Sequence, residues 1–181
     1  MRIVYVLLSP TFGMHQYTAD LANRLVRAGA DVHLVTTSHA PRDRYLPTVT
    51  VHTPVDTTDT GFSPKVLQLK KMRAAREAIL DLDPDLVHVS GPHAWNVPLM
   101  RTVKAEDVPA VHTLHDLDPH VGSGYGVLLR LWNRSVMRTA DHILVHGQTY
   151  YERLLGMGVP PERVTSTPLL HLFVGASWLG P

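Results

Sequence analysis

The sequence contains no cysteine, and this absence removes several classes of chemistry. It excludes disulfides, thiolate metal sites and a cysteine nucleophile, and it fits a reducing compartment, so the cytoplasm is the expected location. An excess of charge is missing as well. The 17 basic and 16 acidic side chains leave a formal net charge of +1, which does not favour nucleic acid as a partner.

Long apolar runs are also lacking. No stretch of the sequence approaches the ~20 apolar residues that a membrane-spanning helix requires. The opening residues 1–10 are apolar only briefly and no A-x-A-like cleavage site follows, so we interpret them as a first strand. The 181 residues are 44% hydrophobic and 18% charged, as in an ordinary globular protein. We therefore expect residues 1–181 to form a single domain.

Short β-rich apolar runs alternate with amphipathic segments along the chain. The expected strands are 2–8, 31–37, 49–53, 85–89, 109–114, 142–146 and 163–167. The expected helices are 14–28, 63–82, 93–105, 124–139 and 148–157, the second with Ser63 as its N-cap and Pro64 at its first position. This alternation predicts an α/β protein: a Rossmann-like, doubly wound parallel sheet with helices on both faces.

Residues 111–120, "VHTLHDLDPH", place three histidines and two aspartates at the end of the fifth expected strand. Ligands bind at the carboxyl ends of the strands in such sheets, so His115 and Asp116 should face the crevice. A histidine there suits proton exchange or contact with a hydroxyl. The alternative is that Asp116 caps a turn and His115 is an ordinary surface histidine. His112, inside the strand, is expected to be structural.

Histidine spacing argues against a metal site. His112 and His115 are three residues apart, so on a strand they point to opposite faces. His142 and His146 share a face but lie about 13 Å apart at roughly 3.3 Å per residue, which is too far for one ion. The sequence also contains no H-E-x-x-H motif.

The loop after the first strand contains a single glycine, Gly13, just before a helix. A helix start can hold a phosphate on its N–H groups, and a glycine lets the ligand approach closely. The dinucleotide motif G-x-G-x-x-G is absent, however, so a plain turn glycine explains this position equally well.

Basic residues recur on two of the expected helices. Arg130, Arg134 and Arg138 are spaced by four, a stripe that could meet anionic lipid headgroups at the inner face of a membrane or an acidic partner. A solvated helix face is the alternative. Leu128 and Trp132 on the same helix are expected in the core. The second group is Lys65, Lys70, Lys71, Arg73 and Arg76.

Five segments, taken in order, resemble one known family. They read "LANRLVRAGADV", "DLVHVSGPH", "VHTLHD", "ADHILVHG" and "LLGMGVPPERV". From Arg2 to about Thr167 the chain is similar to the N-terminal, acceptor-side domain of the family 4 glycosyltransferases, which have the GT-B fold. The sequence departs from the family pattern at Phe12, which precedes Gly13 where a pair of glycines is common, and in "PLLHLFVGASWLGP", which stands where "PNGV" is usual.

The resemblance implies retaining transfer of a sugar from a nucleotide-sugar donor to an acceptor hydroxyl, with no metal and no cofactor. It implies that His115 reaches the donor sugar and that Asp116 holds the loop or an acceptor hydroxyl. Gly13 and Met14 would face the donor phosphates. The candidates for acceptor contacts are His15, Gln16, His93 and His120.

The resemblance also implies a second, donor-binding domain, which we expect to be absent from this chain. The chain alone should then be inactive, bind the donor weakly and self-associate through its uncovered face. Two alternatives remain. The chain could be a separate acceptor-side subunit of a two-chain transferase, or a Rossmann-like binding domain without transfer chemistry.

Overall fold

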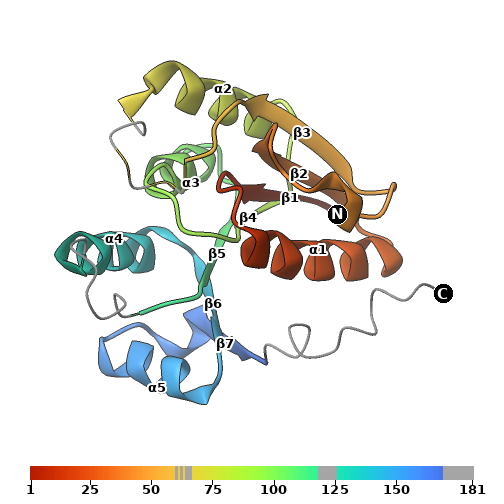
Figure 1. Ribbon diagram of the computed structural model, residues 1–181. Coiled ribbons are helices and arrows are strands. Elements are labelled where there is room, and N and C mark those ends of the chain that lie inside the picture. The colour runs from red at the N-terminus through yellow and green to blue at the C-terminus, as the bar shows by residue number, and fades with distance from the viewer. Residues whose placement is uncertain (60, 62, 64–66, 118–125, 169–181) are drawn as a thin grey trace.

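A computed structural model describes residues 1–59, 61, 63, 67–117 and 126–168. Seven parallel strands form one sheet in the order β3-β2-β1-β4-β5-β6-β7 (Figure 1). The strands are β1 Arg2–Leu7, β2 Asp31–Thr37, β3 Thr50–Val55, β4 Leu86–Val89, β5 Ala110–Leu114, β6 His142–His146 and β7 Val164–Thr167. The predicted fold class is confirmed.

The strand order places the reversal of the sheet between β1 and β4. The chain steps outward from β1 through β2 to β3, then returns to pair β4 with the other side of β1, Val6 beside Val89. Beyond this point the strands run outward in sequence order to β7. Ligands of doubly wound sheets bind at such a reversal, beyond the carboxyl ends of the strands. The ends of β1 and β4 therefore define where a site is expected.

Five helices connect the strands, each close to its predicted position. They are α1 Phe12–Arg27, α2 Leu69–Leu80, α3 Asn96–Lys104, α4 Gly126–Thr139 and α5 Gln148–Gly156, and short 3-10 turns span Arg42–Arg44 and Pro161–Arg163 among the described residues. The described part of the chain contains no helix of the length and apolar character needed to cross a membrane.

The start of α2 differs from the prediction. Its N-cap is Gln68, so the prediction of Ser63 as the cap is wrong. The Ser63 hydroxyl donates instead to the Asp59 carboxylate at 2.6 Å, a local hydrogen bond that competes with helix capping. Pro64, the predicted first helical residue, lies outside the described residues.

The core has two layers, one on each face of the sheet, because side chains alternate along β1. Ile3, Tyr5 and Leu7 pack towards α1. Val4 and Val6 belong to the opposite cluster, which also contains side chains of α2, α3 and α4. Figure 1 shows α1 on one side of the sheet and α2 and α3 on the other. The prediction of helices on both faces is therefore confirmed.

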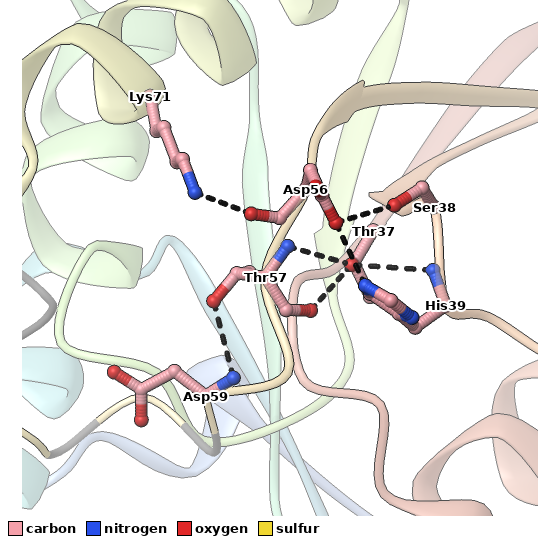
Figure 2. A network of polar contacts seen from close by, with 7 residues as sticks. All are labelled: Thr37, Ser38, His39, Asp56, Thr57, Asp59 and Lys71. Atoms are coloured by element: carbon pink, nitrogen blue, oxygen red, sulfur yellow. Dashed lines mark hydrogen bonds and ion pairs between the residues drawn. The ribbon is translucent and has the colours of Figure 1, made fainter.

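The carboxyl ends of β2 and β3 are held together by a polar network (Figure 2). The Thr37 hydroxyl donates to the Thr57 carbonyl at 2.6 Å. The Asp56 carboxylate accepts hydrogen bonds from Ser38 at 2.9 Å and from the His39 ring at 2.7 Å. These bonds, the Ser38 bond first, hold the pKa of Asp56 below its usual value. The network anchors the chain where it leaves β3.

Candidate functional site at the carboxyl ends of β1, β4 and β5

Helix α1 begins beside the sheet reversal with an open N-terminus. Thr11 occupies the N-cap position, but its side chain caps no helical N–H among the described residues. Its hydroxyl is paired with the Ser9 hydroxyl at 2.7 Å instead. A Cβ atom built on Gly13 would meet no described atom within 4 Å, so the first turn is open on that side. Exposed N–H groups and the helix dipole make such a terminus suitable for an anion.

His115 follows β5 directly and makes two hydrogen bonds at the sheet edge. Its Nε2 atom lies 2.9 Å from the carbonyl oxygen of Ser90, the residue after β4. A carbonyl oxygen only accepts, so Nε2 of His115 carries the hydrogen. Its Nδ1 atom lies 3.2 Å from Nε2 of His146, the last residue of β6. The register of β5 and β6 ends with Leu114 beside Val145, which places these two histidines side by side.

Tyr17 of α1 packs its ring against both histidines. The ring centroids of His115 and of His146 each lie 5.0 Å from that of Tyr17, in edge-to-face geometry. The Tyr17 hydroxyl lies 3.1 Å from the Thr113 hydroxyl, which in turn lies 2.8 Å from Nε2 of His88. Burial lowers the pKa of His88 to about 3, so this ring stays neutral near pH 7. The hydroxyls of Tyr17 and Thr113 and the ring of His88 thus form a connected polar layer beneath His115 and His146, on the strand side of the pair.

The start of α1 and the end of β4 are joined directly. The Thr18 hydroxyl donates to the Met14 carbonyl at 2.8 Å and lies 2.7 Å from the Ser90 hydroxyl. Since the one Thr18 hydrogen is used on Met14, the Ser90 hydroxyl must donate to Thr18. Ser90 therefore contacts the helix through its side chain and His115 through its carbonyl.

Asp116 is exposed, next to His115 and beyond the strand. Its backbone carbonyl accepts a hydrogen bond from the Asn133 side chain of α4 at 3.0 Å, which fixes the end of β5 on that helix. Met14 and Gln16, predicted for the donor and acceptor sides, are half-buried in the first turns of α1.

Two predicted acceptor residues have buried rings. Nδ1 of His15 lies 2.8 Å from the Tyr45 hydroxyl, and Nδ1 of His93 accepts the Trp95 N–H at 3.2 Å. Burial lowers the pKa of each of these histidines to about 4. The structure brings both rings to this end of the sheet but directs these nitrogens to protein groups, and acceptor contact stays a prediction. His120 lies outside the described residues.

His112 lies in the interior of β5, as predicted, with only 1% of its surface exposed. Its ring packs edge-on against Trp132 of α4, and its Nε2 atom accepts from the Asn96 amide at 3.3 Å. His142 bonds the Thr165 hydroxyl at 2.8 Å on the neighbouring strand. In the portion of the chain that the structure describes, no three histidine, aspartate or glutamate side chains are grouped to hold a metal ion.

Helix α4 presents a basic and apolar outer face. Arg130, Arg134 and Arg138 are all exposed. Val127, Leu128 and Leu131 are 65%, 50% and 53% exposed. Trp132 is buried as predicted, but the prediction that Leu128 belongs to the core is wrong, because its neighbour Leu129 takes the position against the core.

His146, Ser90, Thr113 and Tyr17 were not predicted from the sequence as residues of the candidate site. A usable signal existed for His146. Consecutive strands are usually neighbours in a sheet, and "VHTLH" and "ILVH" are consecutive β-rich runs that both end in histidine. The contact between His115 and Ser90 depends on the order of the strands, which the pattern of elements alone does not provide.

Comparison with known proteins decides the family. The model of Glycosyltransferase Family 4 matches residues 13–168. The chain belongs to glycosyltransferase family 4. The predicted resemblance is confirmed, and this family 4 chain has the Rossmann-like sheet of a GT-B domain. No curated protein sequence is detectably similar to it.

Solved structures similar to this family 4 chain share its fold at low sequence identity. UDP-GlcNAc 2-epimerase from Neisseria meningitidis bound to UDP-GlcNAc superposes with a TM-score of 0.70 at 16% identity, over 99% of this chain and 50% of that one. Anabaena HepE in complex with UDP and glucose gives 0.62 at 16% identity, over 93% and 44%. MurG from Acinetobacter baumannii gives 0.58 at 16%, over 93% and 45%. The chain spans about half the length of these proteins.

Proposed function

We propose that this chain is the acceptor-side half of a retaining glycosyltransferase, which moves a sugar from a nucleotide-sugar to an acceptor hydroxyl with a donor-binding domain supplied beyond residues 1–181. The observation that carries the proposal is that two features lie at the same end of the sheet, beside its reversal. One is the uncapped start of α1, and the other is the Nε2–H group of His115. The first suits a phosphate and the second a sugar hydroxyl. Bound UDP in HepE and UDP-GlcNAc in the Neisseria epimerase support a nucleotide-sugar as the ligand of this fold.

In the proposed complex with substrate, the Nε2–H group of His115 donates a hydrogen bond to a hydroxyl of the donor sugar. The Ser90 carbonyl, now 2.9 Å from Nε2, can accept the hydrogen of that same hydroxyl. Asp116 contacts the acceptor or holds the loop, and Gly13 and Met14 line the phosphates at the start of α1. The proposed acceptor contacts are His15, Gln16, His93 and His120.

The decisive experiment is an activity assay of the full product of the gene against a panel of UDP- and GDP-sugars and hydroxyl acceptors. We expect transfer with the anomeric configuration kept and without added metal. If the full product transfers no sugar, even when a second chain that supplies the donor-binding domain is added, the result would favour a Rossmann-like binding domain without transfer chemistry. Because the carboxyl edge would be uncovered, we also expect the 181-residue chain to self-associate with rising concentration in sedimentation experiments.

The outer face of α4 is proposed to contact a membrane surface, with the protein at the cytoplasmic face. Residues 126–139 contain three arginines and no acidic residue. Exposed Val127, Leu128 and Leu131 lie among these arginines rather than on an opposite, buried face. Apolar insertion together with about 1 kcal/mol per arginine near anionic lipid suits a peripheral contact.

Vesicle sedimentation tests this contact. The chain should pellet with vesicles containing phosphatidylglycerol and stay in solution with pure phosphatidylcholine, and salt should weaken the binding. Replacing Arg130, Arg134 and Arg138 by Gln should abolish it. The matched control replaces Lys70, Arg73 and Arg76 of α2 by Gln, which removes the same charge from another exposed face. Equal loss in both variants would show only general charge attraction and would contradict a specific α4 surface.

A further inference from the structure

His146 has no role in the function proposed above, yet it contacts the proposed catalytic histidine through both a ring nitrogen and the ring itself. Its Nε2 atom lies 3.2 Å from Nδ1 of His115, and the two ring centroids are 5.0 Å apart. Both rings also meet the edge or face of Tyr17. The three rings come from β5, β6 and α1, so this packing restrains the His115 ring from two sides.

The hydrogen positions follow from the partners. Nε2 of His115 carries a hydrogen because it faces the Ser90 carbonyl. In neutral His115 the other nitrogen, Nδ1, is then an acceptor, and the atom facing it must be a donor. Nε2 of His146 is that atom, so His146 donates to His115. The hydrogen bond made by one ring nitrogen determines which tautomer a histidine adopts.

This arrangement has a consequence when a ligand arrives. A sugar hydroxyl that accepts the Nε2–H of His115 competes with the Ser90 carbonyl for that hydrogen. Ser90 then orients the ring less strongly, while the His146 donor on Nδ1 still acts on it. The orientation of a catalytic histidine by a third group follows the same logic as in other catalytic sites.

We propose that His146 is a positioning residue, which holds the His115 imidazole in its Nε2–H tautomer with that hydrogen directed to the Ser90 side of the crevice. The inference rests on the proposed function for its catalytic consequence. The tautomer itself is a property of the 181-residue chain and is measurable without any substrate.

The test uses three variants. His146→Phe keeps an aromatic ring against Tyr17 but removes the donor. His146→Gln restores a side-chain amide N–H near the position of the imidazole Nε2. His142→Phe is the matched control, since it lies on the same strand and the same face but bonds Thr165 at the far end.

Long-range proton–nitrogen correlation spectra of the chain report which nitrogen of His115 is protonated. We expect a single pattern, Nε2–H with bare Nδ1, in the native chain and in the His146→Gln and His142→Phe variants. In His146→Phe the Nδ1 resonance of His115 should shift and broaden, because this nitrogen loses its hydrogen-bond donor while the Ser90 carbonyl still accepts from Nε2. In the full-length enzyme the same variant should lower kcat roughly tenfold with little change in KM, because orientation and not donor affinity is lost, and Gln should restore most of it.

Two results would overturn the inference: an Nδ1–H tautomer of His115 in the native chain, or an Nδ1 resonance of His115 in His146→Phe that is the same as in the native chain. If the Phe variant does not fold, the native and Gln spectra still decide the tautomer and the donor. A full-length enzyme that transfers no sugar would count against the proposed function, while the spectra would continue to test the positioning role.

Discussion

His112 and His115 stand three residues apart and pack against opposite faces of the sheet. The ring of His112 lies against Trp132 of α4 at a centroid distance of 5.5 Å, and that of His115 lies against Tyr17 of α1 at 5.0 Å. One side chain is in the core and the other is at the crevice. Substituting each of the two histidines in turn therefore distinguishes an effect on catalysis from an effect on stability.

His115→Ala in the full-length enzyme should lower turnover by about 10²–10³, the usual cost of one contact that stabilises a transition state. Its effect on stability should be small, because the side chain is only partly buried. His112→Ala should show the opposite behaviour and cost roughly 1–3 kcal/mol of unfolding free energy, because it empties a buried site. Initial rates and thermal melts of both variants check this. Near-normal rates in His115→Ala would contradict the catalytic assignment.

The isolated chain should bind nucleotide-sugars weakly or not at all. Most donor contacts are proposed to come from a domain beyond residues 1–181. Residues 1–181 would contribute only the contacts made by the helix start at Gly13 and by His115. Calorimetric titration with common UDP- and GDP-sugars measures this. Low-micromolar affinity of the 181-residue chain would instead indicate a complete binding domain.

Acid should destabilise the fold well above the pH at which carboxylates titrate. Burial lowers the pKa of His88 and of His112 to about 3. The unfolded chain takes up protons on these residues below about pH 6.5, and the folded chain does not. Stability is therefore complete above pH 6.5 and falls towards pH 3, by about 1.4 kcal/mol per pH unit for each histidine.

The control for this pH dependence is His112→Gln, which keeps an acceptor for the Asn96 amide but cannot be protonated. Urea unfolding at pH 7, 6 and 5 should show a shallower loss of stability in the variant than in the native chain. Parallel pH profiles of the two proteins would mean that His112 is protonated in the folded state.

Gly13→Ala and Gly61→Ala should have opposite effects. Gly13 has open space where a Cβ would stand, so Gly13→Ala should leave the melting temperature unchanged or raise it, while the full-length enzyme shows a higher KM for the donor. Gly61 has a φ of 101°, and a Cβ there would lie 2.7 Å from the His93 Cα atom. Gly61→Ala should therefore lower the melting temperature. An unchanged donor KM in Gly13→Ala would contradict phosphate approach at this glycine.

Local patterns predicted the fold closely. The run 31–37 and the run 142–146 coincide with β2 and β6, because a buried parallel strand is encoded by its own β-rich residues. The start of α2 was misplaced, since Ser63 satisfies its hydroxyl on Asp59 and no longer caps a helix. Leu128 was misplaced because one residue along a helix moves a side chain by 100° around the axis, from core to solvent.

The sequence could predict the position of a candidate site residue only where a single segment determines it. His115 and Asp116 follow from the end of their own strand. The partners of His115 come from β4 and β6, and Tyr17 comes from a helix about a hundred residues earlier. These meetings depend on strand order and register, which the periodicity of single segments does not contain.

The hydrogen bond between the Thr18 and Ser90 hydroxyls connects two parts of the proposed site. The helix start that would face the phosphates and the strand end that carries the partner of His115 are coupled across the sheet reversal. A donor-binding domain that closes on this edge of the sheet would then find the helix start and His115 at fixed positions relative to each other. Closure would adjust the gap across the cleft without changing the distance between phosphate and sugar contacts on this side.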